Sequence, residues 1–291
     1  MVATPWSPDE GVPSHSRGTR EVDAVDITVP GPRGDVGMRV YREPGAPPGP
    51  GLVWVHGGGW AAGDIDMPEA DWLGRRLASS GIVVVSVDYR LAKDGVAYPL
   101  PHDDVHAATA WVLDNLSDAG VAPGRCSLGG ASAGADLAVG VAMRLRDEGS
   151  TLPWTLVLAY PALHAALLPP SSALAATLSQ LPPEERLTAS GMDSMARGYA
   201  GVGALDDPYA FPGGHDPAGL PPVFVLLSEV DALRPSGEAF AADAVRAGVP
   251  SLVVCEAGSR HGHLNHAGSA PAEASVRRIA AWLASPRELL L

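Results

Sequence analysis

Lysine is nearly absent from this chain of 291 residues, in which Lys93 is the only one. A Walker A loop requires a glycine directly before its lysine, and Ala92 stands there, so this ATP-binding loop is excluded. The dinucleotide fingerprint G-x-G-x-x-G is missing as well. Basic residues number 20 against 33 acidic ones, for a net charge of −13, which argues against a surface that neutralises nucleic-acid phosphates.

Long apolar runs are also missing. Stretches such as residues 82–85 are far too short to span a bilayer, and we expect no signal peptide because the first twenty residues lack a basic start followed by an apolar run. Cys126 and Cys255 are the only cysteines. Both lie in apolar, strand-like segments, so we expect two buried thiols, with a disulfide or a catalytic cysteine as the alternative. These features predict a cytoplasmic protein without a membrane partner.

Apolar residues make up 46% of the chain, enough to bury a substantial core. Short apolar runs alternate with helical patterns, which predicts a mostly parallel sheet flanked by helices on both faces. The first two strands have no helix between them and should start the sheet in antiparallel fashion. The expected strands are residues 22–29, 36–41, 51–55, 82–87, 126–130, 155–160, 222–228 and 251–256. The expected helices are residues 68–79, 102–117, 133–147, 234–247 and 270–284.

Two stretches interrupt this alternation. Residues 1–21 are polar and punctuated by Pro and Gly, and residues 164–218 are rich in Ala, Leu and Pro with weak helical periodicity. An insertion of that size between core strands is usually a lid or cap, and a long structureless loop is the alternative. We therefore divide the chain into a hydrolase-type core of residues 22–163 and 219–291 and a cap region of residues 1–21 and 164–218.

The most informative segment is the run GGASAG, in which an expected strand meets an expected helix at Ser132. G-x-S-x-G in this context places a serine at the apex of a sharp turn, where its Oγ projects from the backbone. Gly130 and Gly134 remove side chains that would collide across the turn, and the helix N-terminus directs partial positive charge at the reaction centre. The pattern indicates a nucleophile, with a plain tight turn as the alternative.

A second glycine motif, HGGGW, directly follows the expected strand at residues 51–55. Without side chains, backbone N–H groups can approach a substrate oxygen closely and stabilise the negative charge of a tetrahedral intermediate. A loop of this type is the usual partner of the G-x-S-x-G turn. A flexible loop would explain the glycines alone, but both motifs follow strands in the required order.

Together these motifs resemble the hormone-sensitive-lipase-like family of α/β-hydrolase esterases, over roughly residues 50–270. The resemblance extends to VDYRLA at residues 87–92, to PLPHDD at residues 99–104, and to the segments DPY and LPP that lead back into the core. The chain departs from the family pattern at Ala131, where Asp is common, and at Asp136, which replaces Asn. The resemblance implies an α/β-hydrolase fold and a serine esterase activity.

A serine hydroxyl needs a base to take its proton, and the base needs an orienting carboxylate. In α/β-hydrolases the chain order is serine, acid, histidine. Carboxylates follow the expected strand at residues 222–228, and histidines follow the next strand. The resemblance implies that Asp231 is the acid and His261 the base. The order alone leaves three rivals open, which are Glu229, His263 and His266.

One further cluster has metal-ligand spacing, because His102 and His106 lie four residues apart at an expected helix start. The segment has Asp where zinc proteases have Glu, and no third ligand is evident downstream. We therefore expect a solvated helix N-terminus with favourable acids, and no metal site.

We accordingly expect a cofactor-free serine carboxylesterase that acts on short-to-medium acyl esters through an acyl-enzyme. Ser132 attacks, and the oxyanion donors implied by the resemblance are the N–H groups of Gly58, Gly59 and Ala133, with Gly57 as a spacer. The expected partner is a small ester, with a homo-oligomer left open. The alternatives are an amidase or formamidase on the same triad, and a small-molecule receptor of the same fold, which would lack a triad member.

Overall fold

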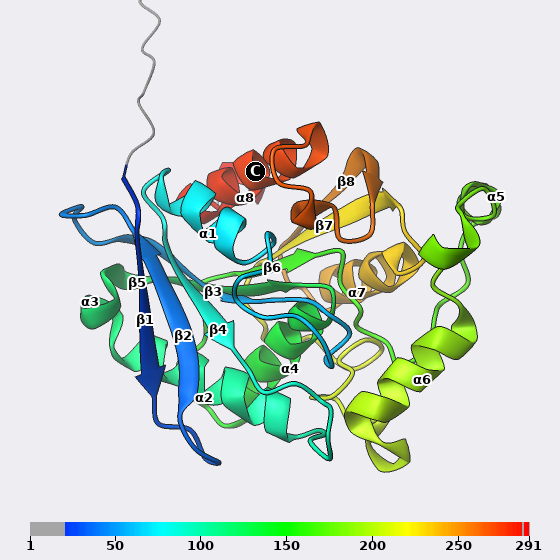
Figure 1. Ribbon diagram of the computed structural model, residues 1–291, viewed down its shortest axis with the longest axis horizontal. Coiled ribbons are helices and arrows are strands. Elements are labelled where there is room, and N and C mark those ends of the chain that lie inside the picture. The colour runs from blue at the N-terminus through cyan, green and yellow to red at the C-terminus, as the bar shows by residue number, and fades with distance from the viewer. Residues whose placement is uncertain (1–20, 287, 291) are drawn as a thin grey trace, which may run out of the picture.

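The protein is described here by a computed structural model that covers residues 21–286 and 288–290. Its centre is an eight-stranded sheet in the order β1-β2-β4-β3-β5-β6-β7-β8 (Figure 1). β1 pairs with β2, and β2 with β4, in antiparallel fashion, while the other neighbours are parallel. The predicted sheet and its antiparallel start are confirmed. The strands are β1 Asp23–Val29, β2 Val36–Arg42, β3 Gly49–Val55, β4 Val83–Asp88, β5 Val121–Ala131, β6 Leu156–Ala159, β7 Val223–Val230 and β8 Ser251–Arg260.

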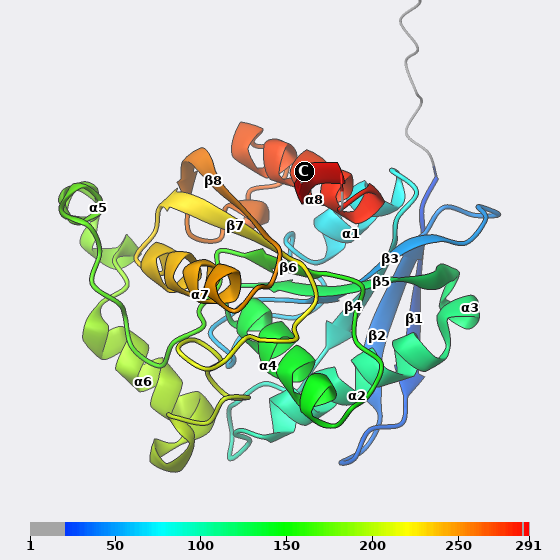
Figure 2. The same ribbon diagram turned by 180° about the vertical axis from the view of Figure 1, so that it is seen from behind.

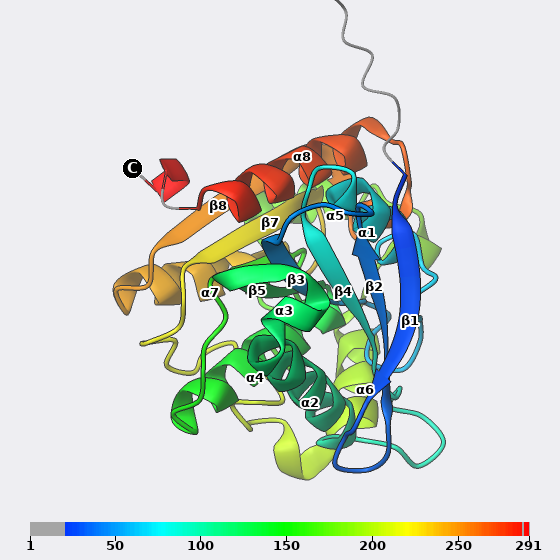
Figure 3. The ribbon, with the colours of Figure 1, turned by 90° about the vertical axis from the view of Figure 1, so that its left-hand side faces the viewer.

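Helices cover both faces of the sheet (Figures 2 and 3). α1 (Asp71–Ala78) and α8 (Ala270–Ala284) pack on one face, and α2 (Leu100–Asp114), α4 (Ala133–Asp147) and α7 (Arg234–Arg246) pack on the other; α3 (Leu116–Ala119) follows α2. β3 shows why the sequence favours this arrangement. Side chains alternate across a strand, so Leu52 and Trp54 enter one apolar cluster while Val53 and Val55 enter the other. No helix within the described ranges is long and apolar enough to cross a membrane.

Residues 164–218 contain α5 (Ser172–Leu178) and α6 (Ala189–Ala200), with short 3-10 turns at Pro183–Glu185 and Val202–Ala204. Both helices lie beyond the sheet on the side away from β1 (Figure 1). Each begins at a capping side chain, because Ser171 accepts the Leu174 N–H and Thr188 accepts the Gly191 N–H. The stretch is therefore helical and not a structureless loop. Of the other proposed cap segment, residues 1–20 lie outside the described part of the chain.

The two cysteines differ in exposure, contrary to our expectation. Cys126 is a buried free thiol, whereas Cys255 is a free thiol exposed at the surface. Cys255 lies on β8, which forms the edge of the sheet. Leu252 and Val254 pack toward the α8 side, so the alternate residues of the strand point outward, and Val253 is 43% exposed.

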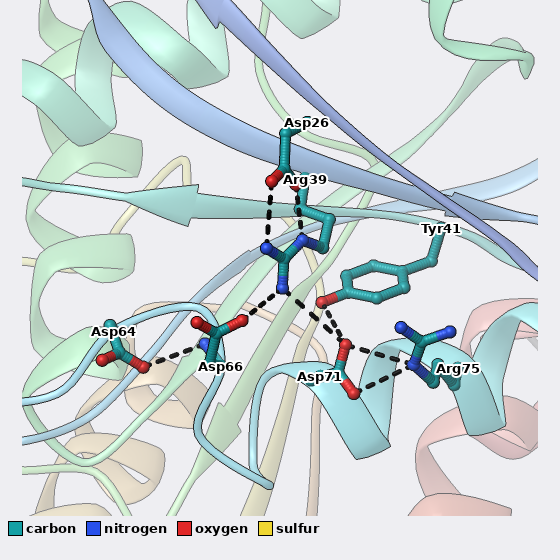
Figure 4. A network of polar contacts seen from close by, with 7 residues as sticks. All are labelled: Asp26, Arg39, Tyr41, Asp64, Asp66, Asp71 and Arg75. Carbon is teal, nitrogen blue, oxygen red and sulfur yellow. Dashed lines mark hydrogen bonds and ion pairs between the residues drawn. The ribbon is translucent and has the colours of Figure 1, made fainter.

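A polar network on the outside of the sheet ties its antiparallel strands to the loop that follows β3 (Figure 4). The Arg39 guanidinium on β2 donates to Asp26 of β1, with Nη2 3.0 Å from Oδ2, and to Asp66 of the loop. Tyr41 O–H donates to Asp71 at the start of α1. Bidentate pairing of this kind fixes geometry as well as charge, so the loop is anchored from outside.

Candidate active site

Ser132 lies between the end of β5 and the start of α4 with φ at 53°, in the left-handed region that non-glycine residues rarely occupy. The glycines on either side make this turn feasible. A Cβ on Gly130 would lie 2.4 Å from the carbonyl carbon of Gly134, and one on Gly134 would lie 2.1 Å from the carbonyl oxygen of Val55. Neither separation is compatible with a side chain. The local sequence therefore forces the serine to the apex of the turn.

The structure brings Ser132, His261 and Asp231 together from three separate strand ends. Ser132 Oγ lies 2.9 Å from His261 Nε2, and His261 Nδ1 lies 2.8 Å from Asp231 Oδ2. The other carboxylate oxygen of Asp231 accepts the Leu233 N–H at 2.8 Å, which fixes the acid in place. With its Nδ1 proton held by Asp231, His261 presents an unprotonated Nε2 to the serine hydroxyl.

The electrostatics of this arrangement favour a charged imidazole. Burial disfavours the charged form of His261, but Asp231 outweighs it by charge and hydrogen bond and, with a smaller contribution from Glu69, raises the pKa of the ring above its usual value. The imidazolium that forms when a histidine takes a proton is thus stabilised in advance. The ring is still reached from solvent, because its side chain is 39% exposed.

Three backbone N–H groups belong to residues that line the cavity together with Ser132. Gly58, Gly59 and Ala133 line the same cavity as the serine, and among the described residues their N–H groups donate to no protein acceptor. The two glycines adopt φ values of 114° and 58°, which a side chain would strain. Gly57 differs, because its N–H donates to the Glu69 carboxylate at 2.7 Å.

Ser132 opens into a cavity of about 1010 Å³, a volume typical of sites for small organic ligands. The walls come from the sheet ends and from α5 and α6. Met195 of α6 reaches the oxyanion side, since its Sδ lies 3.1 Å from where a Cβ on Gly59 would stand. The lining is mainly apolar and includes Met67, Ala162, Ala175, Leu178, Leu181, Leu187, Met192, Met195 and Leu233.

The rival acid and bases are placed differently. Glu229 accepts the Gly258 N–H at 2.7 Å and lies on the outer side of β7. His263 is buried between Ser228 and Ser275, at 3.0 and 2.7 Å, and burial lowers its pKa to about 4. His266 lines the cavity, but Ser132 Oγ bonds to the ring of His261.

The helix start at His102 is not solvated, and that expectation was wrong. His102 is buried and stacks on Tyr209, with ring centroids 6.1 Å apart, and burial lowers its pKa to about 4. The Tyr209 segment can approach α4 because the helix carries Gly140 there, where a Cβ would lie 2.2 Å from the Tyr209 carbonyl oxygen. His106 instead pairs with Glu148 at 3.0 Å. Within residues 21–286 and 288–290 no group of three or more His, Cys, Asp or Glu is arranged to hold a metal ion.

Sequence reasoning missed three polar residues of the site. Glu69, Tyr160 and Asn265 all line the cavity. None belongs to the motifs that single out Ser132 or the glycine loop, and each comes from a different part of the chain. The only signal in the sequence was that Glu69 is a carboxylate twelve positions after Gly57. Its role depends on tertiary contacts that the sequence does not show.

Comparisons with known proteins show the family of the chain. A family model described as alpha/beta hydrolase fold matches residues 52–265. Among curated proteins, the esterase LipI of Mycobacterium tuberculosis is 33% identical over 270 residues, which cover 90% of this chain and 82% of LipI. The carboxylesterase NlhH of the same organism is 33% identical over 255 residues, covering 85% of this chain and 77% of NlhH.

Solved structures give the same result. A Pyrobaculum calidifontis esterase superposes with a TM-score of 0.81 at 35% identity, covering 92% of this chain and 86% of that one. EstE1, a thermostable carboxylesterase cloned from a metagenomic library, superposes with a TM-score of 0.81 at 32% identity, covering 90% of this chain and 88% of its own.

Proposed function

Because this chain belongs to the α/β-hydrolase fold family, in its hormone-sensitive-lipase-like branch, we propose that it cleaves short-to-medium acyl esters with Ser132 as nucleophile. By its relatives it is a carboxylic ester hydrolase. One observation carries the proposal for the site. The 2.9 Å contact between Ser132 and His261 lies at the wall of an apolar cavity beside three backbone N–H groups without protein acceptors.

Acylation follows from these contacts. His261 Nε2 takes the hydroxyl proton as Ser132 Oγ forms a bond to the ester carbonyl carbon, and the carbonyl electron pair moves onto its oxygen. The N–H groups of Gly58, Gly59 and Ala133 donate to this oxyanion. When the intermediate collapses, the bond to the leaving oxygen breaks and His261 returns the proton to the departing alcohol. Asp231 stabilises the imidazolium throughout.

Deacylation repeats the same steps with water. His261 accepts a proton from a water molecule while the water oxygen attacks the acyl carbon. The oxyanion that forms accepts hydrogen bonds from the same three N–H groups. Collapse breaks the bond to Ser132 Oγ, which regains a proton from His261, and the carboxylic acid leaves. All of these roles are carried by side chains and backbone groups of the chain itself, so no metal or organic cofactor is assigned.

We assign the cap to residues 164–218, together with the start of the chain. In support, α5 and α6 contribute apolar side chains to the wall of the cavity that Ser132 also lines. Arg260, next to His261, is ion-paired with Glu185 of the segment between the two helices. An acyl chain that enters from Ser132 therefore ends against this segment. The cytoplasmic location expected from the sequence stays a prediction.

This closed end predicts an optimum of acyl length. We expect kcat/KM on p-nitrophenyl esters from acetate to palmitate to rise by roughly fourfold per added CH₂, about 0.8 kcal/mol each, and to fall once the cavity is full. Emulsified triglycerides should be poor substrates. A preference for long-chain triglyceride with a jump in rate at the emulsion interface would contradict the cap assignment.

The raised pKa of His261 predicts the shape of the pH profile. The ring must be neutral to act as a base, so kcat/KM should increase with pH through an apparent pKa above the ordinary histidine value of about 6.5 and then reach a plateau. Initial rates measured in buffers of constant ionic strength test this. An acid limb centred well below that value would show that Asp231 does not stabilise the imidazolium.

A further inference from the structure

Glu69 is a buried carboxylate that the mechanism above leaves unused. Its side chain is only 1% exposed, yet it lines the cavity. Oε1 accepts the Gly57 N–H at 2.7 Å, and Oε2 accepts the Tyr160 O–H at 2.6 Å and an Asn265 N–H at 2.9 Å. Every partner is a donor, so the carboxylate is the acceptor in all three hydrogen bonds.

These partners belong to the segments that carry the active site. Gly57 directly precedes the two glycines of the oxyanion loop. Asn265 lies four residues after His261, in the 3-10 turn His263–Asn265, and its side-chain oxygen also accepts the Glu69 backbone N–H at 3.2 Å. Tyr160 contacts His261 edge to face, with ring centroids 5.1 Å apart. One carboxylate thus connects the oxyanion loop to the base.

We propose that Glu69 is a positioning residue that joins the oxyanion loop to the His261 loop and whose charge stabilises the protonated base during acylation. The inference rests on the proposed function. Glu69 acts through Gly57 and His261 and does not touch the reacting atoms. Because the oxyanion donors and the base serve one intermediate, a rigid tie between them maintains the geometry on which both depend.

The packing leaves little freedom at this tie. A Cβ on Gly57 would lie 2.6 Å from Glu69 Oε1 and 3.3 Å from the Cβ of Ser132. The loop, the carboxylate and the nucleophile therefore lie close together, with no room for a side chain on Gly57. The loop between β3 and α1, which carries Gly57 and Glu69, is also held by a hydrogen bond from Arg39 to Asp66.

The charged and titratable groups near His261 differ in their effect on the pKa of its ring. Asp231 and Glu69 raise its pKa against the effect of burial. His263 stays neutral near pH 7, since burial lowers its pKa to about 4, and Arg260 is engaged by Glu185. Among the described residues, the charged or titratable groups that line the cavity or act on His261 are Asp231, Glu69, Tyr160, Glu185, Arg186, Arg260, His263 and His266. Removal of the Glu69 charge should therefore lower the pKa of the base.

The test is the pair Glu69→Gln and Glu69→Asp, measured as full pH profiles of kcat and KM on p-nitrophenyl butyrate. For Glu69→Gln we expect kcat to fall roughly 10- to 100-fold with little change in KM, and the acid limb to move to lower pH by about half a unit. Glu69→Asp keeps the charge but shortens the side chain, so its acid limb should stay near that of the wild type while kcat falls. A wild-type kcat and acid limb in Glu69→Gln would overturn the proposal.

Asp104→Asn is the matched control, because Asp104 is another buried carboxylate whose partner is Arg90, away from the cavity wall. It should leave the acid limb unchanged, and a shift equal to that of Glu69→Gln would contradict a specific role. If Glu69→Gln does not fold, Asn265→Ala breaks the same tie, and an unchanged kcat there would refute it. Covalent labelling of Ser132 in wild-type protein by an organophosphate separates the two cases, since a failure to label would count against the acyl-enzyme itself.

Discussion

Replacement of Ser132 by alanine is expected to lower kcat by about 10⁶-fold while the protein stays folded. Once Oγ is gone no acyl-enzyme can form, and only direct attack by water remains, assisted by the oxyanion donors and by substrate binding. Ser132 is 9% exposed and its turn is shaped by the flanking glycines, so loss of one hydroxyl should cost little stability. Steady-state rates on p-nitrophenyl butyrate, with thermal unfolding as a check of folding, measure the effect.

Ser86→Ala provides the matched control. The Ser86 hydroxyl is buried in β4 and has no hydrogen-bond partner within the described residues, so its removal makes the same chemical change away from the cavity. Its kcat should equal that of the wild type. A Ser132→Ala protein with ordinary kinetics would exclude this serine as the nucleophile.

The second large effect is expected for Asp231→Asn, with a loss of about 10⁴-fold in kcat. An amide that donates to His261 Nδ1 would stabilise the tautomer with its proton on Nε2, and that nitrogen could then no longer accept the Ser132 proton. The side chain of residue 231 can still accept the Leu233 N–H through its remaining oxygen, so the fold should be retained. The rate loss is measured at the pH of the wild-type plateau.

Glu229→Gln is the control for the choice of acid. Glu229 lies two residues earlier but bonds to Gly258 on the neighbouring strand, so its neutralisation should leave kcat within about twofold. The reverse result, in which Glu229→Gln is inactive and Asp231→Asn is active, would show that Glu229 and not Asp231 is the acid.

Local motifs made much of this fold and site predictable from the sequence. The turn at Ser132 and the glycine loop depend on residues adjacent in the chain, and the strands before them have apolar patterns that short-range rules can read. The order of serine, acid and base restricts the acid and the base to the ends of later strands. The resemblance then selects Asp231 and His261, whereas Glu229 and His263 could be set aside only once their hydrogen bonds were known.

Features that depend on packing could not be predicted. His102 looked solvated because two acids follow it in the sequence, but Tyr209, which is far away in the chain, stacks on the ring, and His102 is buried. Cys255 looked buried because its neighbours are apolar, but it lies on an edge strand, and strand order is not readable from one segment. Glu69 resembles any loop carboxylate until Gly57 and Asn265 come together around it.

The most direct test of the central claim, that Ser132 forms a covalent acyl-enzyme, is to map the site of reaction with an organophosphate ester. Such reagents are attacked by an activated serine and leave a phosphorylated product that His261 cannot readily release. Mass spectrometry of the inactivated protein should show one adduct per chain, on the peptide that contains Ser132. Full inactivation with the adduct on another residue, or full activity after exhaustive treatment, would contradict the account.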